Sequence, residues 1–282
     1  MTAIGNRKTK LSNNLKKAIK GIEKHFYFHI TDKLTHRHTF GAKRIMEKMK
    51  VEIWSDVMCP FCYIGKRRFE AAFQEFEHKD NIEIEWKSFQ LNPDLVTDPK
   101  ININDYLAER KGITIDHARQ MNDHVTSMAA EAGLKYDFDK AIVANSFNAH
   151  RLSHLAKKHG LGDAMEEALF KAYFTEGKNT DDKQTLIDLG AAIGLDADEI
   201  RQTLDSNDFA DAVKHDIAES QYLGIQGVPF FVMNRKYGVS GAQAVPVFAE
   251  TLEKAFEEWQ QTNKSQLTII EGESCTPDGD CG

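Results

Sequence analysis

One stretch of the sequence decides the fold: Val51-Glu52-Ile53-Trp54-Ser55-Asp56-Val57-Met58-Cys59-Pro60-Phe61-Cys62. Its beginning is rich in β-branched and aromatic residues and predicts a strand over 51–57. Apolar residues that recur at helical spacing predict a helix over 61–76 directly after it. Alternating apolar and charged residues predict a second strand over 81–89. Strand, helix and strand in close succession indicate a βαβ unit.

Between about residue 93 and residue 224 the sequence has the pattern of helices alone. Gly133, Gly160 and Gly194 stand where helices of this segment are expected to end, because glycine readily ends a helix. Short polar side chains that favour helix N-caps stand at four further positions. These expected caps are Asp116, Asp139, Asp181 and Asn207.

The final part of the chain returns to the pattern of strands. Segments 230–233 and 237–240 predict a hairpin, and a helix is expected over 247–261. The order βαβ, helices, ββα is that of an α/β protein with a thioredoxin-like fold and a large α-helical domain inserted in its middle. The predicted segments are a basic extension at 1–48, expected to be disordered, the thioredoxin-like domain at 49–92 and 224–262, the inserted helical domain at 93–223, and a tail with a cysteine pair at 263–282.

Composition and charge limit the classes of function. The chain of 282 residues is 41% hydrophobic, so it can bury a sizeable core, but no apolar run approaches the roughly 18 residues of a membrane span. Residues 1–48 carry 12 basic and 3 acidic side chains, whereas the rest carries 24 basic and 40 acidic ones. An acidic main body repels phosphate backbones. Neither a nucleic acid nor a membrane is therefore expected as a partner.

The basic N-terminal segment carries no secretory signal, because it lacks both an apolar core and a small-residue cleavage site. Scarce acidic residues leave a transit peptide as an alternative, although such peptides prefer arginine and serine to lysine. The simpler interpretation is an extension, or coding sequence upstream of a start at Met46 or Met49. We therefore expect a cytoplasmic protein.

Cys59 and Cys62 stand at the junction of the first predicted strand and helix, with two residues between them. The free N–H groups and positive dipole end of a helix stabilise a thiolate, which is the nucleophile of disulfide exchange. Pro60 suits the first turn because its missing N–H is not needed there. This pattern predicts a redox motif with Cys59 as attacking and Cys62 as resolving cysteine. Two inert reduced cysteines, or half of a zinc site, are the alternatives.

Gly227-Val228-Pro229-Phe230 precedes the third predicted strand. Proline cannot donate to a sheet ladder, so it can simply mark the first residue of a strand. X-Pro is also the bond that readily adopts the cis form. We predict a cis Val228–Pro229 bond beside the dithiol, where backbone groups are free to pair with an extended substrate.

The combined motifs resemble the DsbA-like thioredoxin-fold family and, within it, the FrnE-type branch of dithiol–disulfide oxidoreductases. The resemblance covers about residues 49–261 and implies that Cys59 is the nucleophile, Cys62 the resolving cysteine and Pro229 the cis-proline. It also implies that the inserted helices lie over the active site. Substrate-binding positions are expected at Val228, Pro60, Phe61 and His150. The stretches that carry the resemblance are 54–65, 148–152, 227–232 and 237–243.

Two departures limit what the resemblance implies. Periplasmic DsbA enzymes carry histidine between the cysteines, whereas this chain has Phe61, so Cys59 should be less acidified and its disulfide less oxidising. In the related hydroxychromene-carboxylate isomerases and kappa-class glutathione transferases, serine usually replaces the first cysteine. A glutathione-dependent transferase or isomerase is the alternative function. The expected partners are protein or small-molecule thiols and disulfides, glutathione included, and no cofactor is implied.

Cys275 and Cys281 are expected to form an accessory redox pair that exchanges with Cys59 and Cys62. A structural zinc site made of the four thiols is an alternative, but the five residues between Cys275 and Cys281 exceed the usual ligand spacing. His150 and His154 share a helix face and could also bind a metal, although packing near the active site is the simpler explanation. A pure interaction module is a further alternative, which would show no redox chemistry. The sequence contains no Walker A or dinucleotide-binding fingerprint.

Overall fold

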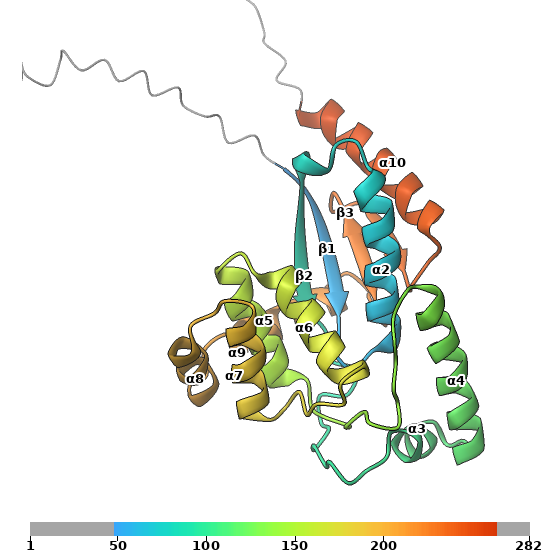
Figure 1. The fold of residues 1–282 in the computed structure, drawn as a ribbon. Helices are drawn as coiled ribbons and strands as arrows, with labels where there is room; N and C mark the ends of the chain where they lie inside the picture. The colour runs from blue at the N-terminus through green and yellow to red at the C-terminus, as the bar shows by residue number, and fades with distance from the viewer. Residues whose placement is uncertain (1–47, 264–282) are drawn as a thin grey trace, which may run out of the picture. The chain divides into compact units, whose positions relative to one another are not determined.

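The computed structural model describes residues 48–263, which form a mixed α/β structure around one four-stranded sheet (Figure 1). The strands lie in the order β2-β1-β3-β4. Strand β1 runs parallel to β2 and antiparallel to β3, and β3 pairs antiparallel with β4. A parallel pair requires a crossover connection, which α2 provides. The bounds are β1 (Met49–Ser55), α2 (Pro60–Glu75), β2 (Ile82–Ser88), β3 (Phe230–Met233) and β4 (Tyr237–Ser240).

The segment between β2 and β3 is helical, as its period predicts. A short 3-10 turn, η1 (Lys79–Asn81), precedes β2, and the last helix, α10, follows β4. No helix in the described part of the chain has the length and apolar character to cross a membrane. The helices are α3 (Ile103–Lys111), α4 (Ile115–Glu131), α5 (Phe147–Lys158), α6 (Gly162–Phe174), α7 (Lys183–Ala192), α8 (Ala197–Asp205), α9 (Ala210–Tyr222) and α10 (Val245–Asn263).

None of the four residues expected to cap a helix is the N-cap residue in the structure. Two of them lie one or two positions after or before the observed cap, and the other two lie in loops. Thr114 caps α4 by accepting a hydrogen bond from the His117 N–H, and Asp182 caps α7. Asp116 and Asp181 are therefore neighbours of the caps, while Asp139 and Asn207 lie in the loops that precede Ser146 and Phe209, the N-cap residues of α5 and α9. The expected helix ends are confirmed: Gly133, Gly160 and Gly194 follow α4, α5 and α7 with positive φ angles.

The hydrophobic core is continuous between the sheet and the helices that surround it. Helices α2 and α10 pack against each other beside the sheet (Figure 1). The rings of Phe231 on β3 and Phe248 on α10 meet edge to face, with centroids 4.7 Å apart. The same core extends to Leu152 on α5 and Phe170 on α6. Trp54 of β1 belongs to a second cluster with Ile225 and Val232. The final five residues of β1 are buried, so the core encloses the carboxyl end of this strand where the first loop begins.

Candidate active site

Cys59 is the N-cap residue of α2, with Pro60 in the first helical position. The Cys59 N–H donates to the Asp56 carbonyl at 2.9 Å, and the Cys62 N–H donates to the Cys59 carbonyl at 3.0 Å. The loop from β1 thus turns tightly into the helix. As predicted, the two cysteines lie at a strand–helix junction, the first at the positive end of the helix and the second in its first turn.

The sulfur of Cys59 lies against the segment that precedes β3. Its thiol donates a hydrogen bond to the Val228 carbonyl, with Sγ and oxygen 3.4 Å apart. The Val228–Pro229 peptide bond is cis, which confirms the prediction from the sequence. Cys59 and Cys62 are both free thiols and are only 4% and 1% exposed. The dithiol is therefore set into the protein, with the first sulfur next to the cis-proline segment.

Cys62 is the more deeply buried cysteine, as predicted for the resolving position. Burial and the neighbouring Cys59 raise the pKa of the Cys62 thiol well above its usual value. The Ser55 hydroxyl and the Asp56 backbone act in the opposite direction and favour the thiolate. Cys62 is therefore protonated at neutral pH in the reduced protein, and it must lose a proton before it can act as a nucleophile.

Asp56 holds the loop that carries Cys59. Its carboxylate is fully buried and accepts a hydrogen bond from the Leu91 N–H at 2.7 Å. His150 on α5 lies 3.6 Å from the same carboxylate and 2.9 Å from the Phe89 carbonyl. Burial alone would lower the pKa of His150, but Asp56, together with Glu166 and the Phe89 carbonyl, outweighs it and raises that pKa. The loop is thus fixed both to the end of β2 and to α5.

Pro229 packs tightly on helix α2. A Cβ atom placed on Gly65 would lie 2.9 Å from Pro229 Cγ, which is closer than ordinary contact. The Pro229 carbonyl accepts a hydrogen bond from the Gly241 N–H at 2.8 Å. Gly65 therefore permits the close approach that brings the Val228 carbonyl to Cys59.

A mainly apolar cavity of about 490 Å³ opens over the first cysteine, and we call it the Cys59 cavity. Helices α3 and α4 supply much of its wall, including Tyr106 and Val125. Arg110 and Lys111, at the end of α3, add positive charge. Phe61 also lines it and is 38% exposed. The cavity can hold a small molecule or an apolar peptide side chain beside Cys59.

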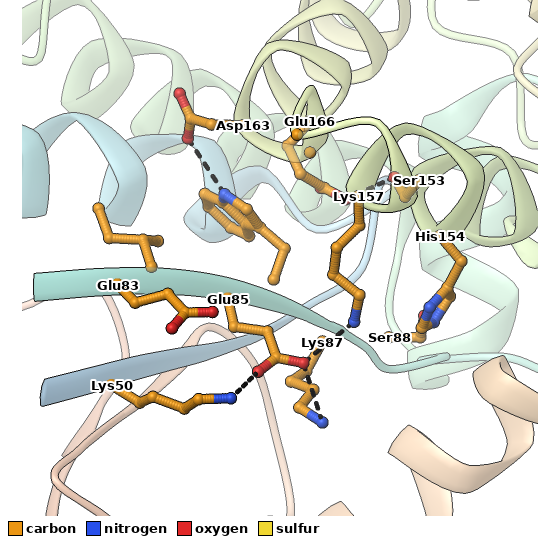
Figure 2. Close-up of a pocket in the computed structure, with 14 residues that line it drawn as sticks. Lys50, Glu83, Glu85, Lys87, Ser88, Ser153, His154, Lys157, Asp163 and Glu166 are labelled. Carbon is orange, nitrogen blue, oxygen red and sulfur yellow. Dashed lines mark hydrogen bonds and ion pairs between the residues drawn. The ribbon is translucent and has the colours of Figure 1, made fainter. Parts of the chain in front are cut away.

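A second cavity of about 480 Å³ runs along β2 and faces α5 and α6 (Figure 2). Its charges largely pair with one another: Glu85 lies between Lys50 and Lys157, at 3.3 and 3.1 Å. The indole of Trp86 donates to Asp163 at 3.1 Å. Neither cysteine lines this cavity, so the Cys59 cavity is the candidate active site.

The structure brings most of the predicted site residues together. Pro60, Phe61 and Val228 line the Cys59 cavity with Cys59 itself. His150 does not: its ring is 2% exposed and faces Asp56, so its placement supports contact with the loop rather than with a bound substrate.

The remaining predicted sites concern the second cysteine pair and metals. Cys275 and Cys281 lie outside the described residues, so their predicted exchange with the first pair stays a prediction. Within residues 48–263, no three histidine, cysteine, aspartate or glutamate side chains converge as they would around a metal ion.

Sequence reasoning did not identify three polar residues of the site. Tyr136 donates its hydroxyl hydrogen to the Pro60 carbonyl at 2.7 Å, across the first turn of α2. Ser55 and Asp56 lie at the end of β1, within the decisive stretch, and polar side chains where a core strand ends could have marked them. Tyr136 lies between two helices, 77 positions after Cys59, where no local pattern connects it to the motif.

Comparison with known proteins places this site in a family. Residues 50–253 match the family model of the DSBA-like thioredoxin domain. The uncharacterized protein YwbO of Bacillus subtilis (strain 168) is 28% identical over 218 residues, which cover 72% of this chain and 94% of YwbO. The crystal structure of SCO1869 from Streptomyces coelicolor, described as a probable DsbA oxidoreductase, is 38% identical with a TM-score of 0.71, and the match covers 83% of this chain and 98% of SCO1869.

The fold also resembles that of a more distant enzyme. The cytosolic disulfide reductase DsbM from Pseudomonas aeruginosa, in its structure with GSH, is 18% identical with a TM-score of 0.52. That match covers 76% of this chain and 99% of DsbM. At this identity the likeness concerns the fold alone.

Proposed function

Because this chain belongs to the DSBA-like thioredoxin domain family, we propose that it is a thiol–disulfide oxidoreductase that acts through Cys59 and Cys62. The observation that carries the proposal is the position of Cys59 Sγ. It lies at the N-terminus of α2, 3.4 Å from the Val228 carbonyl, on the wall of the Cys59 cavity. A thiolate at this point is stabilised by the helix and can meet a disulfide that enters the cavity.

The reaction has two exchange steps. The Cys59 thiolate attacks one sulfur of a substrate disulfide, a bond forms between that sulfur and Cys59, and the other substrate sulfur leaves as a thiolate. Cys62 then attacks Cys59, forms the Cys59–Cys62 disulfide and releases the second substrate thiol, which receives the proton that Cys62 gives up. The substrate disulfide is reduced, and the protein dithiol is oxidised.

The motifs support finer assignments within this proposal. They favour the FrnE-type branch of the family and a cytoplasmic enzyme. They also favour a thioredoxin-like domain at 49–92 and 224–262 that is interrupted by a helical domain at 93–223. In a reducing compartment, reduction or isomerisation of disulfides is favoured over net oxidation. The apolar wall of the Cys59 cavity and its two cations fit a thiol or disulfide with an apolar part and a carboxylate, as in a peptide or glutathione.

Two matched variants test the proposal. Cys59→Ser should abolish disulfide reduction, because no nucleophile remains in the cavity. Cys62→Ser should instead accumulate a mixed disulfide between substrate and Cys59, because the attacking sulfur survives without its resolving partner. Insulin reduction and intact-protein mass spectrometry measure the two effects. Faster alkylation of Cys62 than of Cys59 in the reduced protein would contradict the assignment of roles.

The same pair separates the alternative function. A glutathione-dependent transferase or isomerase would use the Cys59 cavity for glutathione but would need no resolving cysteine. Such an enzyme should keep its activity in the Cys62→Ser variant. Loss of turnover together with a trapped mixed disulfide therefore favours the oxidoreductase, whereas full turnover without a trapped species favours the alternative.

A further inference from the structure

Tyr173 on α6 carries a buried hydroxyl to which the two exchange steps give no role. The side chain is 1% exposed, and its hydroxyl has no hydrogen-bond partner in the described part of the chain. Among the described residues that line the Cys59 cavity, this is the one buried side-chain oxygen or nitrogen without a partner. A buried polar group without a partner is uncommon and costs stability, so its presence calls for a physical reason.

Tyr173 lines the Cys59 cavity together with Cys59 itself. Its ring meets that of Phe174 edge to face, with centroids 4.7 Å apart, and Phe174 stacks on Tyr136 with centroids 4.6 Å apart. The Tyr136 hydroxyl donates to the Pro60 carbonyl in the first turn of α2. A row of three packed rings therefore fixes Tyr173 relative to the helix that carries the dithiol.

The Tyr173 hydroxyl keeps its proton at neutral pH and is therefore a hydrogen-bond donor. Burial raises its pKa far above the usual value for tyrosine. The two other uncharged polar side chains of the wall, apart from the thiol, already have partners: Tyr106 accepts a hydrogen bond from Asn92 at 3.0 Å, and Asn122 donates to Asn104 at 2.8 Å. The missing partner of Tyr173 is therefore an acceptor, and a bound substrate can supply it.

We infer that Tyr173 is a substrate-binding residue whose hydroxyl donates a hydrogen bond to an amide carbonyl of a peptide disulfide held in the Cys59 cavity. This inference rests on the proposed function and names its substrate class. A cystine within a peptide has amide carbonyls on both sides of its sulfur, whereas a substrate carboxylate would be drawn to the two cations, Arg110 and Lys111. The hydrogen bond orients the disulfide toward Cys59, and it transfers neither a proton nor an electron.

Binding at Tyr173 requires an adjustment of the cavity wall, because the hydroxyl is buried in the free protein. Helix α3 supplies part of this wall, and of the helices and strands it packs chiefly against α4 (Figure 1). An element with few packed neighbours shifts at low cost. An entering peptide can therefore displace side chains of α3 and reach the hydroxyl without disturbing the sheet.

The first experiment measures stability, which separates a binding role of the hydroxyl from a structural one. Tyr173→Phe removes the hydroxyl and no existing hydrogen bond, so the midpoint of chemical denaturation should be unchanged or higher. Tyr136→Phe is the control: it removes the hydrogen bond to the Pro60 carbonyl and should lower the midpoint. A midpoint that falls in Tyr173→Phe as it does in Tyr136→Phe would show a structural role and overturn the inference.

The second experiment measures binding of a probe that cannot exchange. N-acetyl-S-methylcysteine N-methylamide has the two amide carbonyls of a peptide cysteine but a thioether in place of the disulfide, and its binding is followed by NMR titration. Tyr173→Phe should weaken this binding about fivefold, the value of one neutral hydrogen bond. Tyr237→Phe, whose hydroxyl bonds to Glu258 away from the cavity, should bind as the wild type does. Equal affinity of Tyr173→Phe and wild type would overturn the inference, whether or not the protein catalyses exchange.

The third experiment measures attack by Cys59 as the only thiol, in a Cys62→Ser, Cys275→Ser, Cys281→Ser background. Formation of the mixed disulfide is followed by mass spectrometry with two uncharged probes: N,N′-diacetylcystine bis(N-methylamide), which carries amide carbonyls, and diethyl disulfide, which carries no oxygen. Tyr173→Phe should slow the reaction with the cystine amide about fivefold and leave that with diethyl disulfide unchanged. Equal slowing of both reactions would mean that Tyr173 acts on Cys59 itself, and would overturn the inference.

Discussion

Two serines in register at the ends of β1 and β2 have opposite surroundings. On β2, the Ser88 N–H and hydroxyl both have partners: the N–H donates to Asp216 at 3.0 Å, and the hydroxyl lies 3.2 Å from His154 Nε2. Ser55 is the last residue of β1, where the loop to Cys59 begins, and its buried hydroxyl forms no hydrogen bond of ordinary geometry. The two residues differ in what they lie next to, and not in burial or position along the strand.

The ends of two paired strands therefore have different surroundings: the end of β2 lies in a polar cluster, and the end of β1 leads to the cysteine motif. The β1 end leads into the loop that carries Cys59 and Cys62, the two sulfurs that we propose to exchange with a substrate disulfide.

The largest effect is expected at Asp216, which belongs to the polar cluster around Ser88. Asp216 lies on α9 and is 2% exposed. It accepts hydrogen bonds from the Ser88 N–H and, at 3.1 Å, from Lys87. Asp216→Asn should lower the free energy of unfolding by about 2–3 kcal/mol, because the Ser88 N–H and the Lys87 ammonium both lose a charged acceptor. The ammonium keeps two other carboxylates, those of Glu85 and Glu219, at 3.5 and 3.1 Å. Chemical denaturation at neutral pH measures this loss. Asp211→Asn, on the exposed side of the same helix, is the control and should change stability by less than about 0.5 kcal/mol.

The pH dependence of this effect has a defined sign. Burial opposes ionisation of Asp216, but His154, the Ser88 N–H and Lys87 outweigh it and lower the Asp216 pKa from 3.8 to about 2. A carboxyl group with a lowered folded-state pKa contributes stability above its unfolded-state pKa and loses it as pH falls through the folded-state value. The difference between wild type and Asp216→Asn should therefore be complete above about pH 5 and shrink toward pH 2. A difference that stays constant over this range would contradict the described partners.

A substitution at Gly65 tests the contact between α2 and the Val228–Pro229 segment beside Cys59. Gly65→Ala places a methyl group 2.9 Å from Pro229 Cγ, so α2 and the cis-proline segment must move apart. We expect a loss of about 1–3 kcal/mol in stability, as for other overpacked sites, together with slower disulfide exchange at Cys59. Gly162→Ala on α6 meets its nearest atoms at 3.6 Å and should change neither quantity appreciably. If exchange at Cys59 is as fast in Gly65→Ala as in wild type, contact with the Val228 segment is not needed for the reaction.

The smallest expected effect concerns Cys275 and Cys281, the predicted accessory pair. Because this pair belongs to the same chain as Cys59, exchange between them would be intramolecular, and tethering can give effective concentrations up to the millimolar range. In a Cys62→Ser chain, mass spectrometry should find disulfides from Cys59 to Cys275 or Cys281. A chain truncated after Gln266 should exchange with external disulfides but lose this internal route. Absence of both cross-links, with full activity of the truncated chain, would exclude the accessory role.

Much of the fold could be predicted because its signals are local. The hairpin at 230–233 and 237–240 follows from alternation and a short turn, and the structure reproduces both strands. The first strand is shifted: it begins at Met49 and ends at Ser55, because Val57 belongs to the turn that Asp56 closes onto Cys59. The helix caps were misplaced for a similar reason, since several neighbouring polar residues can cap equally well and backbone geometry selects among them.

Only the site residues whose type and spacing are typical of a redox motif could be predicted from the sequence. These residues are Cys59, Cys62 and Pro229. The walls of the Cys59 cavity have no such signal, because α3 and α4 look like ordinary amphipathic helices until they are folded over the motif. His150 was expected at the substrate and lies instead behind the loop, against Asp56. Which face of α5 meets which loop is a tertiary property that no local pattern contains.

The central claim is tested most directly by a redox titration of the full chain. The protein is equilibrated in thiol–disulfide buffers of graded potential, quenched with acid, alkylated, and mapped by peptide mass spectrometry. We predict a reversible two-electron couple whose oxidised form contains a Cys59–Cys62 disulfide. Its potential should be more reducing than the about −120 mV of DsbA, since Phe61 replaces the cationic neighbour of the nucleophile. Failure to form a Cys59–Cys62 disulfide at any potential would contradict the account.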